Sequence, residues 1–160
     1  MTQLMASRPG SSENAAPRLD APSIEELSSF IRAAGLVVEE ASATVVTGHL
    51  VLGPEHHTPW GIVHGGVYAT AVESAASIGA SAAVQHRGQV AVGITNTTNF
   101  LRSLSAGRVL VEATPLHQGR SQQLWRVDIT DDTGRLVAHG EVRLQNVTSL
   151  PSGPLEDRHE

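Results

Sequence analysis

The stretch WGIVHGGVYATAVESAASIGASAAVQH, from Trp60 to His86, decides how this 160-residue chain folds. After its paired glycines the stretch continues without proline and consists mainly of Ala, Ser, Val and Gly, which predicts one long helix with small side chains on every side. A surface helix normally carries charged residues along one face. Between Gly65 and Gln85 the only acidic or basic side chain is Glu73, so this helix is predicted to be buried.

Glu73 and the start of the helix are the candidate chemical groups. A buried carboxylate without partners costs several kcal/mol, so Glu73 needs a polar niche or a chemical role, unless it simply lies at a subunit edge. The glycines of His64-Gly65-Gly66 let a ligand approach the free N–H groups of the helix start, which favours negative charge. By helical rise Glu73 lies roughly 12–14 Å further along. If both ends act in one reaction, a second copy of the chain must bring its Glu73 to the first copy's His64 and Gly65.

The run HHTPWGIVHGGVYATAVESAAS resembles the catalytic helix of hotdog-fold acyl-CoA thioesterases of the 4-hydroxybenzoyl-CoA and phenylacetate-degradation type, whose hallmark is HGG followed by an acid. The likeness continues through NTTNFLRSLSAG, TPLHQGRSQQLW and ITDDTGRLVAHGEVRLQN, so it covers roughly Leu36 to Asn146. It implies an α+β hotdog fold, in which a curved antiparallel sheet wraps around one long central helix. It also implies homodimers with two composite active sites, and such homodimers often pair again into homotetramers.

The resemblance assigns a role to each of four helix residues. Glu73 would attack the thioester carbonyl as a nucleophile or act as general base for the attacking water, and the sequence leaves both routes open. The Gly65 N–H would bind the carbonyl oxygen as negative charge develops on it. Ser77, one turn after Glu73, would hold the carboxylate or the water, or would only pack. His64 would orient the loop, bind substrate or help the thiolate leave, or would be purely structural.

The chain departs from the family at Thr58, six residues before the histidine of HGG. Several family members carry a Gln there that helps polarise the thioester, and the Thr hydroxyl is shorter. The neighbouring His57 is a candidate substitute. This departure supports the alternative in which the protein binds acyl-CoA without hydrolysing it. His56, His57 and His64 together suggest a metal site, but no acid or Cys stands at ligand spacing, so no metal is predicted.

Coenzyme A carries phosphates, so a chain with a net charge of −5 needs a local basic site to bind it. The residues predicted to contact the substrate or coenzyme A are Arg102, Arg120, Ser121, Gln122, His57 and Gly66. Coenzyme A is part of the substrate, and no separate cofactor is predicted. A hydratase or dehydratase of the same fold is a further alternative. The acid nine residues after the histidine and the lack of a preceding Pro-Gly loop disfavour it.

Length and composition predict one globular domain. Residues 1–21 are rich in Ser, Pro, Ala and Asn, as in a disordered extension, residues 22–147 would form a single hotdog thioesterase domain, and residues 148–160 a mobile polar tail. Because aromatic residues make up only 3% of the chain, the core must consist of Val, Leu, Ile and Ala. The predicted elements before the central helix are a short amphipathic helix that starts near Ile24 and ends at Gly35, and two strands at 36–40 and 43–52 that form a hairpin or one bent strand pair. After the central helix, strands are predicted at 90–100, 108–117, 122–130 and 136–147, joined by short turns as an antiparallel meander.

Charge and cysteine content exclude several classes of protein. The negative net charge and the lack of basic runs argue against nucleic-acid and anionic-membrane partners. The absence of Cys removes disulfides, thiolate nucleophiles and the common zinc motifs, and fits a reducing compartment. The most hydrophobic span, Val67 to Val84, is interrupted by Glu73 and several Ser, so no transmembrane segment is predicted. We therefore expect a cytoplasmic protein.

Overall fold

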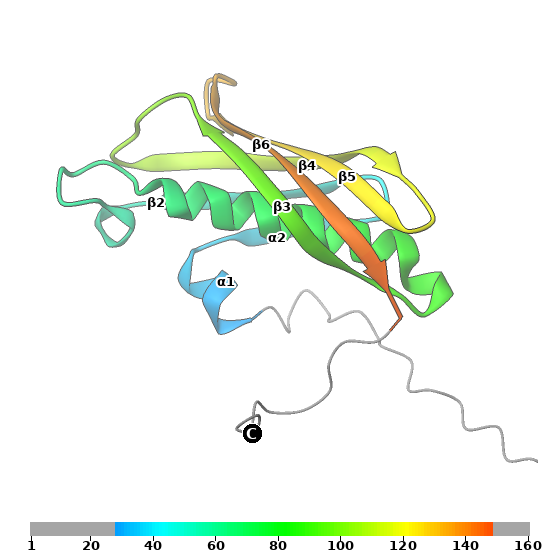
Figure 1. The fold of residues 1–160 in the computed structure, drawn as a ribbon. Helices are drawn as coiled ribbons and strands as arrows, with labels where there is room; N and C mark the ends of the chain where they lie inside the picture. The colour runs from blue at the N-terminus through cyan, green and yellow to red at the C-terminus, as the bar shows by residue number, and fades with distance from the viewer. Residues whose placement is uncertain (1–27, 149–160) are drawn as a thin grey trace, which may run out of the picture.

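The computed structural model describes residues 28–148, which form one curved sheet and one long helix (Figure 1). In chain order the elements are α1 (Ser29–Ala33), β1 (Val37–Ala41), β2 (Val46–Leu52), the 3-10 helix η2 (Pro54–His56), α2 (Gly65–Val84), the 3-10 helix η3 (Gln85–Arg87), β3 (Val90–Phe100), β4 (Gly107–Gln118), β5 (Gln122–Asp131) and β6 (Leu136–Val147). Among helices in this part of the chain, none is long and apolar enough to cross a membrane. The predicted extension at 1–21, residues 22–27 of the predicted domain and the tail from 149 onward lie outside the described residues.

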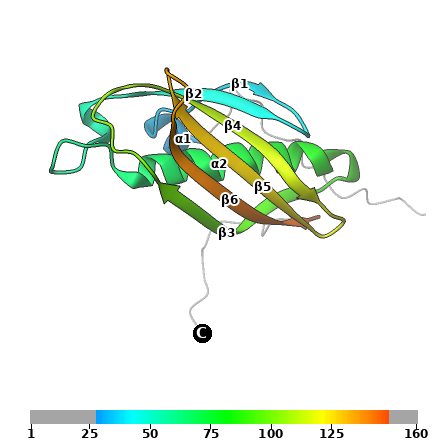
Figure 2. The same ribbon diagram turned by 90° about the horizontal axis from the view of Figure 1, so that it is seen from above.

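The six strands form one antiparallel sheet in the order β1-β2-β4-β5-β6-β3. The sheet curves around α2, as the view from above shows most clearly (Figure 2). This arrangement confirms the α+β hotdog architecture that the resemblance implied. Strands β3 and β6 have the predicted limits, and β2 begins three residues later than predicted, at Val46. Within the described residues the short first helix has Ser28 as its N-cap and ends at Ala33, and the first part of the predicted helix, residues 24–27, lies outside them.

The prediction of a simple meander is wrong for β3. Strands β4, β5 and β6 do pair in series, but β3 pairs with β6, from Val90 opposite Val147 to Phe100 opposite Ala138. Strand β4 instead pairs with β2. The chain re-enters the sheet at its far edge after α2 has crossed the concave face, and the connection at 101–106 then returns to the free edge of β2. Local turn signals indicate where strands end, but they do not show which edge the next strand joins.

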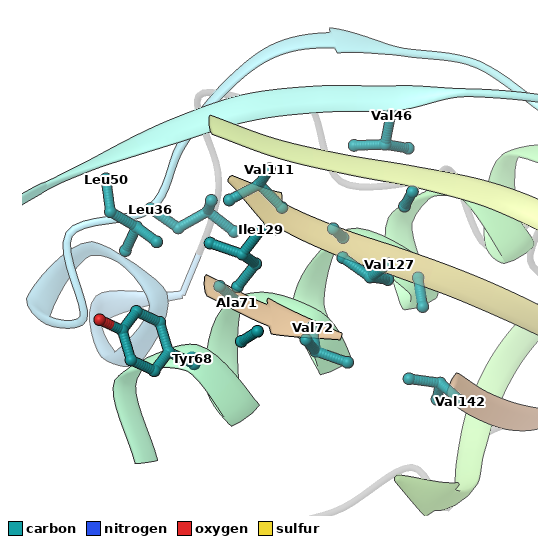
Figure 3. Packing of buried hydrophobic residues seen from close by; sticks show 14 of the residues in the cluster. Leu36, Val46, Leu50, Tyr68, Ala71, Val72, Val111, Val127, Ile129 and Val142 are labelled. Atoms are coloured by element: carbon teal, nitrogen blue, oxygen red, sulfur yellow. The ribbon is translucent and has the colours of Figure 1, made fainter. Parts of the chain in front are cut away.

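The core lies between α2 and the concave face of the sheet (Figure 3). Strand β5 alternates as predicted, with Trp125, Val127 and Ile129 fully buried and Arg126 exposed on the other face. The small residues of α2 let the helix approach the sheet closely. A Cβ built on Gly79 would stand 2.5 Å from the Trp125 ring, so any side chain there would overpack the core, at a typical cost of about 1–3 kcal/mol.

Candidate functional site

His64 is the N-cap of α2, as the sequence indicated. Its backbone is extended and its Nδ1 accepts a hydrogen bond from the Gly66 N–H at 2.8 Å. Because Nδ1 accepts, a neutral His64 ring carries its proton on Nε2. The His64 N–H donates to the carbonyl of His56 at 2.8 Å, so His64 also ties the preceding loop to the helix. A Cβ at Gly66 would lie 2.9 Å from Nδ1, which explains the glycine at this position.

Gly65 places a free N–H at the start of α2. Within residues 28–148 this N–H donates to no other group. A Cβ at Gly65 would come within 2.8 Å of the Phe100 ring, so a side chain there would displace that ring from the helix start. The rings of Phe100 and Tyr68 also meet, with centroids 6.3 Å apart. The helix start therefore offers an unused N–H donor next to the Phe100 and Tyr68 rings. The helix dipole favours negative charge at this position.

Glu73 lies further along α2 and faces the edge strand β3. Its side chain is half-buried, and Oε2 accepts a hydrogen bond of 2.9 Å from the Asn96 amide. Its Oε1 lies only 2.1 Å from the place where a Cβ of Gly93 would stand. Sequence reasoning did not single out Asn96 or Gly93. The signal was Asn96 and Thr98 at alternate positions of a predicted strand, which puts two polar side chains on one face.

A single chain does not bring Gly65 and Glu73 together. Gly65 lies against Phe100, at the end of β3, whereas Glu73 lies against Gly93 and Asn96, earlier in the same strand. The two residues are eight positions apart on one continuous helix, which corresponds to roughly 12 Å. Within one chain, a single carbonyl group cannot reach both the Gly65 N–H with its oxygen and the Glu73 carboxylate with its carbon.

Two of the other predicted residues, Thr58 and His57, form structural hydrogen bonds in the loop before α2, whereas Ser77 does not. The Thr58 hydroxyl accepts from the Trp60 N–H at 3.4 Å, inside a turn that the Thr58 N–H closes onto the carbonyl of Ile62. The Nε2 of His57 donates to the carbonyl of Ser105 and so joins two loops. The Ser77 hydroxyl has no hydrogen bond within the described part of the chain, where the donor to the carboxylate of Glu73 is an amide of β3.

A cavity of about 390 Å³ lies at the opposite end of α2. It is lined by residues of α2, η3 and the β4–β5 turn: Ala83, Val84, His86, Arg87, Gln118, Gly119, Arg120 and Gln123. Over residues 28–148, neither the Arg87 nor the Arg120 guanidinium forms an ion pair or a hydrogen bond. Arg102, the other predicted arginine, is exposed after β3 and does not line this cavity.

Buried amides hold the turn that carries Arg120. The Asn146 amide donates to the carbonyls of Gly119 and Arg120, each at 3.1 Å. Gln123 in turn donates to Asn146 and to a carbonyl of α2, both at 2.8 Å, and accepts from the Trp125 indole at 3.0 Å. These bonds connect the turn to the core, so the Arg120 backbone is fixed. Of the two neighbouring predicted residues, Ser121 contributes a carbonyl to Asn146, and Gln122 donates to Gln145 at 3.2 Å.

Among the residues that the structure describes, the histidines do not come together as a group of metal ligands. The buried His56 accepts from the Gly53 N–H through Nδ1 at 3.2 Å. Among residues 28–148 no group of three His, Asp or Glu side chains is placed to hold a metal ion.

Tyr68 has a buried hydroxyl without a hydrogen-bond partner in the described part of the chain. Burial raises the pKa of the Tyr68 phenol above its ordinary value.

Comparison with known proteins finds similarity in sequence and in structure. The Thioesterase superfamily profile matches residues 61–138. A provisionally named esterase of Mycobacterium tuberculosis is 54% identical over 93 residues. The match covers 57% of this chain and 66% of the esterase, so this chain spans a little under two thirds of the esterase's length. The 1,4-dihydroxy-2-naphthoyl-CoA hydrolase of Listeria monocytogenes is 37% identical over 100 residues, 62% of this chain and 78% of that enzyme. The solved structure of the Mycobacterium tuberculosis esterase superposes with a TM-score of 0.73 at 46% identity, over 76% of this chain and 98% of that one.

Proposed function

The chain belongs to the thioesterase superfamily, and we propose that it hydrolyses an acyl-CoA thioester to a free acid and coenzyme A. The observation that carries this proposal is the free N–H of Gly65 at the start of α2, combined with the Glu73 carboxylate that an amide of β3 holds further along the same helix. Hydrolysis of a thioester needs both groups, because one stabilises the developing oxyanion and the other supplies or activates the nucleophile.

In the proposed reaction the thioester oxygen accepts a hydrogen bond from the Gly65 N–H. A donor of this kind typically lowers the barrier by about 3–4 kcal/mol, because it binds the oxygen more strongly once the charge has formed. Glu73 either bonds to the carbonyl carbon, to give an anhydride that water then hydrolyses, or takes a proton from the attacking water. In both routes the C–S bond breaks and the sulfur leaves as a thiolate. The Nε2–H group of His64 can donate a hydrogen bond to that thiolate.

We propose that two chains share each site, as homodimers that can pair again into homotetramers. In the composite site, Gly65 and His64 of one chain face Glu73 of the other. The free edge of β3 supports this, since Val92 and Ile94 on that strand are 40% and 52% exposed in the single chain. An exposed apolar edge strand is a surface that proteins usually cover. Two antiparallel copies of α2 would place each helix start beside the middle of the other.

The cavity at the far end of α2 is the proposed site for the phosphates of coenzyme A. Arg87 and Arg120 supply two unpaired guanidinium groups, and guanidinium is well matched to phosphate oxygens. From Glu73 to Val84 the helix rises roughly 16 Å, so an extended pantetheine arm can connect the two places. Ser121 and Gln122, beside Arg120, and Arg102, which follows Phe100 at the end of β3 and lies away from this cavity, remain further proposed contacts for the substrate or coenzyme A.

The alternative without catalysis has one specific observation in its favour. Thr58 replaces the Gln of several family members, and its shorter hydroxyl accepts a hydrogen bond from the Trp60 N–H within its own turn. A panel of acyl-CoAs and a thiol-reactive dye separate the possibilities. Release of free thiol shows hydrolysis, whereas saturable binding without thiol release shows a non-catalytic acyl-CoA-binding protein. Loss of an enoyl absorbance without thiol would show the hydratase alternative.

A further inference from the structure

We propose that Asn96, locked by Thr98, is a positioning residue that fixes the carboxylate of Glu73 and leaves its Oε1 as the reacting oxygen. This inference rests on the proposed thioesterase function and adds to it a device on β3. Neither Asn96 nor Thr98 belongs to the helix that carries the other candidate groups, and both lie on the strand that faces Glu73.

The hydrogen bonds determine which way the Asn96 amide points. Its Nδ2 donates to Oε2 of Glu73 at 2.9 Å and to the carbonyl of Ala69 at 3.1 Å. Both partners only accept hydrogen bonds when the carboxylate is ionised, so the NH2 group must face them. The Oδ1 of Asn96 then points to Thr98, whose hydroxyl donates to it at 2.6 Å. All polar atoms of the amide are therefore used, and a rotation by half a turn would set oxygen against oxygen.

An irregularity in β3 brings the supporting residues to one face. Residues three positions apart in a regular strand point to opposite faces. Gly93 and Asn96 both face Glu73, and the pairing with β6 shifts register between Gly93 and Thr95. A bulge of this kind re-aims the side chains that follow it. Gly93 thus opens the space for the carboxylate, and the shifted strand supplies the amide that holds it.

This geometry distinguishes the two oxygens of Glu73. Oε2 is occupied by the amide, whereas Oε1 has no hydrogen-bond partner within residues 28–148. Oε1 is therefore the oxygen that bonds to the carbonyl carbon, or that accepts the proton of the attacking water. A bond from a neutral amide to a carboxylate is charge-assisted, and such bonds are stronger than neutral ones. Thr98 does not touch the reacting atoms and acts through Asn96.

The test compares Thr98→Val, which removes the hydroxyl but keeps the shape, with Thr98→Ser, which keeps the hydroxyl. Thr97→Val is the matched control, because Thr97 is the exposed neighbour on the opposite face. We expect Thr98→Val to lower kcat about 10-fold, as for one lost hydrogen bond, with KM unchanged. Thr98→Ser and Thr97→Val should stay within about 2-fold of wild type. Melting and oligomeric state are measured in parallel.

A kcat for Thr98→Val equal to that of Thr97→Val would overturn the inference, and so would a failure of Thr98→Ser to restore activity. A second variant, at Asn96 itself, tests the same hydrogen bond independently of Thr98. Asn96→Asp keeps the side-chain shape but sets a second carboxylate against Glu73, and we expect kcat to fall by about 100-fold, since small misplacements of catalytic groups have effects of this size. Wild-type thiol release is the reference throughout: its absence would refute the proposed function itself, whereas unaffected variants would refute only the role of Asn96.

Discussion

Gly93→Ala is the substitution whose effect follows most directly from the geometry. The added Cβ would stand 2.1 Å from Oε1 of Glu73, whereas ordinary contact begins at 3.4 Å. The carboxylate or the strand must therefore move by about 1.3 Å, and a misplacement of about 1 Å can cost on the order of 100-fold in rate. The substitution adds one methyl group and removes no polar atom, so the expected loss arises from displacement alone.

The assay is steady-state thiol release from one acyl-CoA, measured with thermal unfolding of the same preparation. We expect kcat to fall by about 100-fold and KM to change little, because the substrate contacts lie elsewhere. Gly93 does not have a positive φ, so alanine strains no backbone angle there, and the melting temperature should change little. A kcat within a few-fold of wild type in a folded protein would show that the Glu73 carboxylate does not act from this position.

Three further predictions test the coenzyme A site and two buried groups. Alanine at Arg87 or Arg120 should raise KM for an acyl-CoA with kcat intact and leave pantetheine thioesters unaffected, while alanine at the exposed Arg143 serves as control; equal effects on both substrates would refute a phosphate site. Tyr68→Phe removes a buried hydroxyl without a partner and should stabilise the protein by about 1 kcal/mol at neutral pH in urea unfolding. Because burial raises the Tyr68 pKa, the stability linked to this phenol is complete below about pH 10 and is lost as pH rises through the raised pKa of the folded state. Tyr68→Phe should therefore lose less stability than wild type above pH 10. Parallel curves of unfolding free energy against pH for the two proteins would contradict this. Hydrogen bonds from the Thr133 hydroxyl, and then from Arg135, lower the pKa of Asp131, so the stability that its carboxylate contributes is present above about pH 4 and is lost at lower pH. Asp131→Asn should therefore flatten the fall in unfolding free energy below pH 4. An unchanged slope would refute a stabilising contribution from the Asp131 carboxylate.

The sequence predicted the central helix and most strand limits because these follow from local patterns. The lack of charge around Glu73 and the glycines after His64 are visible without a structure, and so is the alternation around Trp125. The resemblance to hotdog-fold thioesterases then predicted that the sheet wraps around this helix. What local patterns could not show is pairing, so the place of β3 beside β6 was missed.

The support of Glu73 was missed for a related reason. Asn96 and Gly93 reach the carboxylate only because β3 is the edge strand over that part of α2 and because its register shifts between Gly93 and Thr95. A regular alternation would have put them on opposite faces. Similarly, Gln123 and Asn146 are far apart in sequence and read as ordinary polar strand residues, yet they meet in the core to fix the turn beside the cavity. These contacts depend on tertiary pairing.

The shared active site is the central claim, and mixing two inactive variants tests it most directly. Glu73→Gln removes the carboxylate, and Gly65→Pro removes the N–H. Gly65→Ala is the control, because it places a Cβ against the Phe100 ring as proline does but keeps the N–H. If random exchange between two-fold symmetric dimers combines the variants, one site of each heterodimer is intact, and thiol release should return toward about a quarter of the wild-type rate. No recovery, with exchange shown by mass spectrometry and both variants folded, would mean that Gly65 and Glu73 act within one chain and would contradict the account.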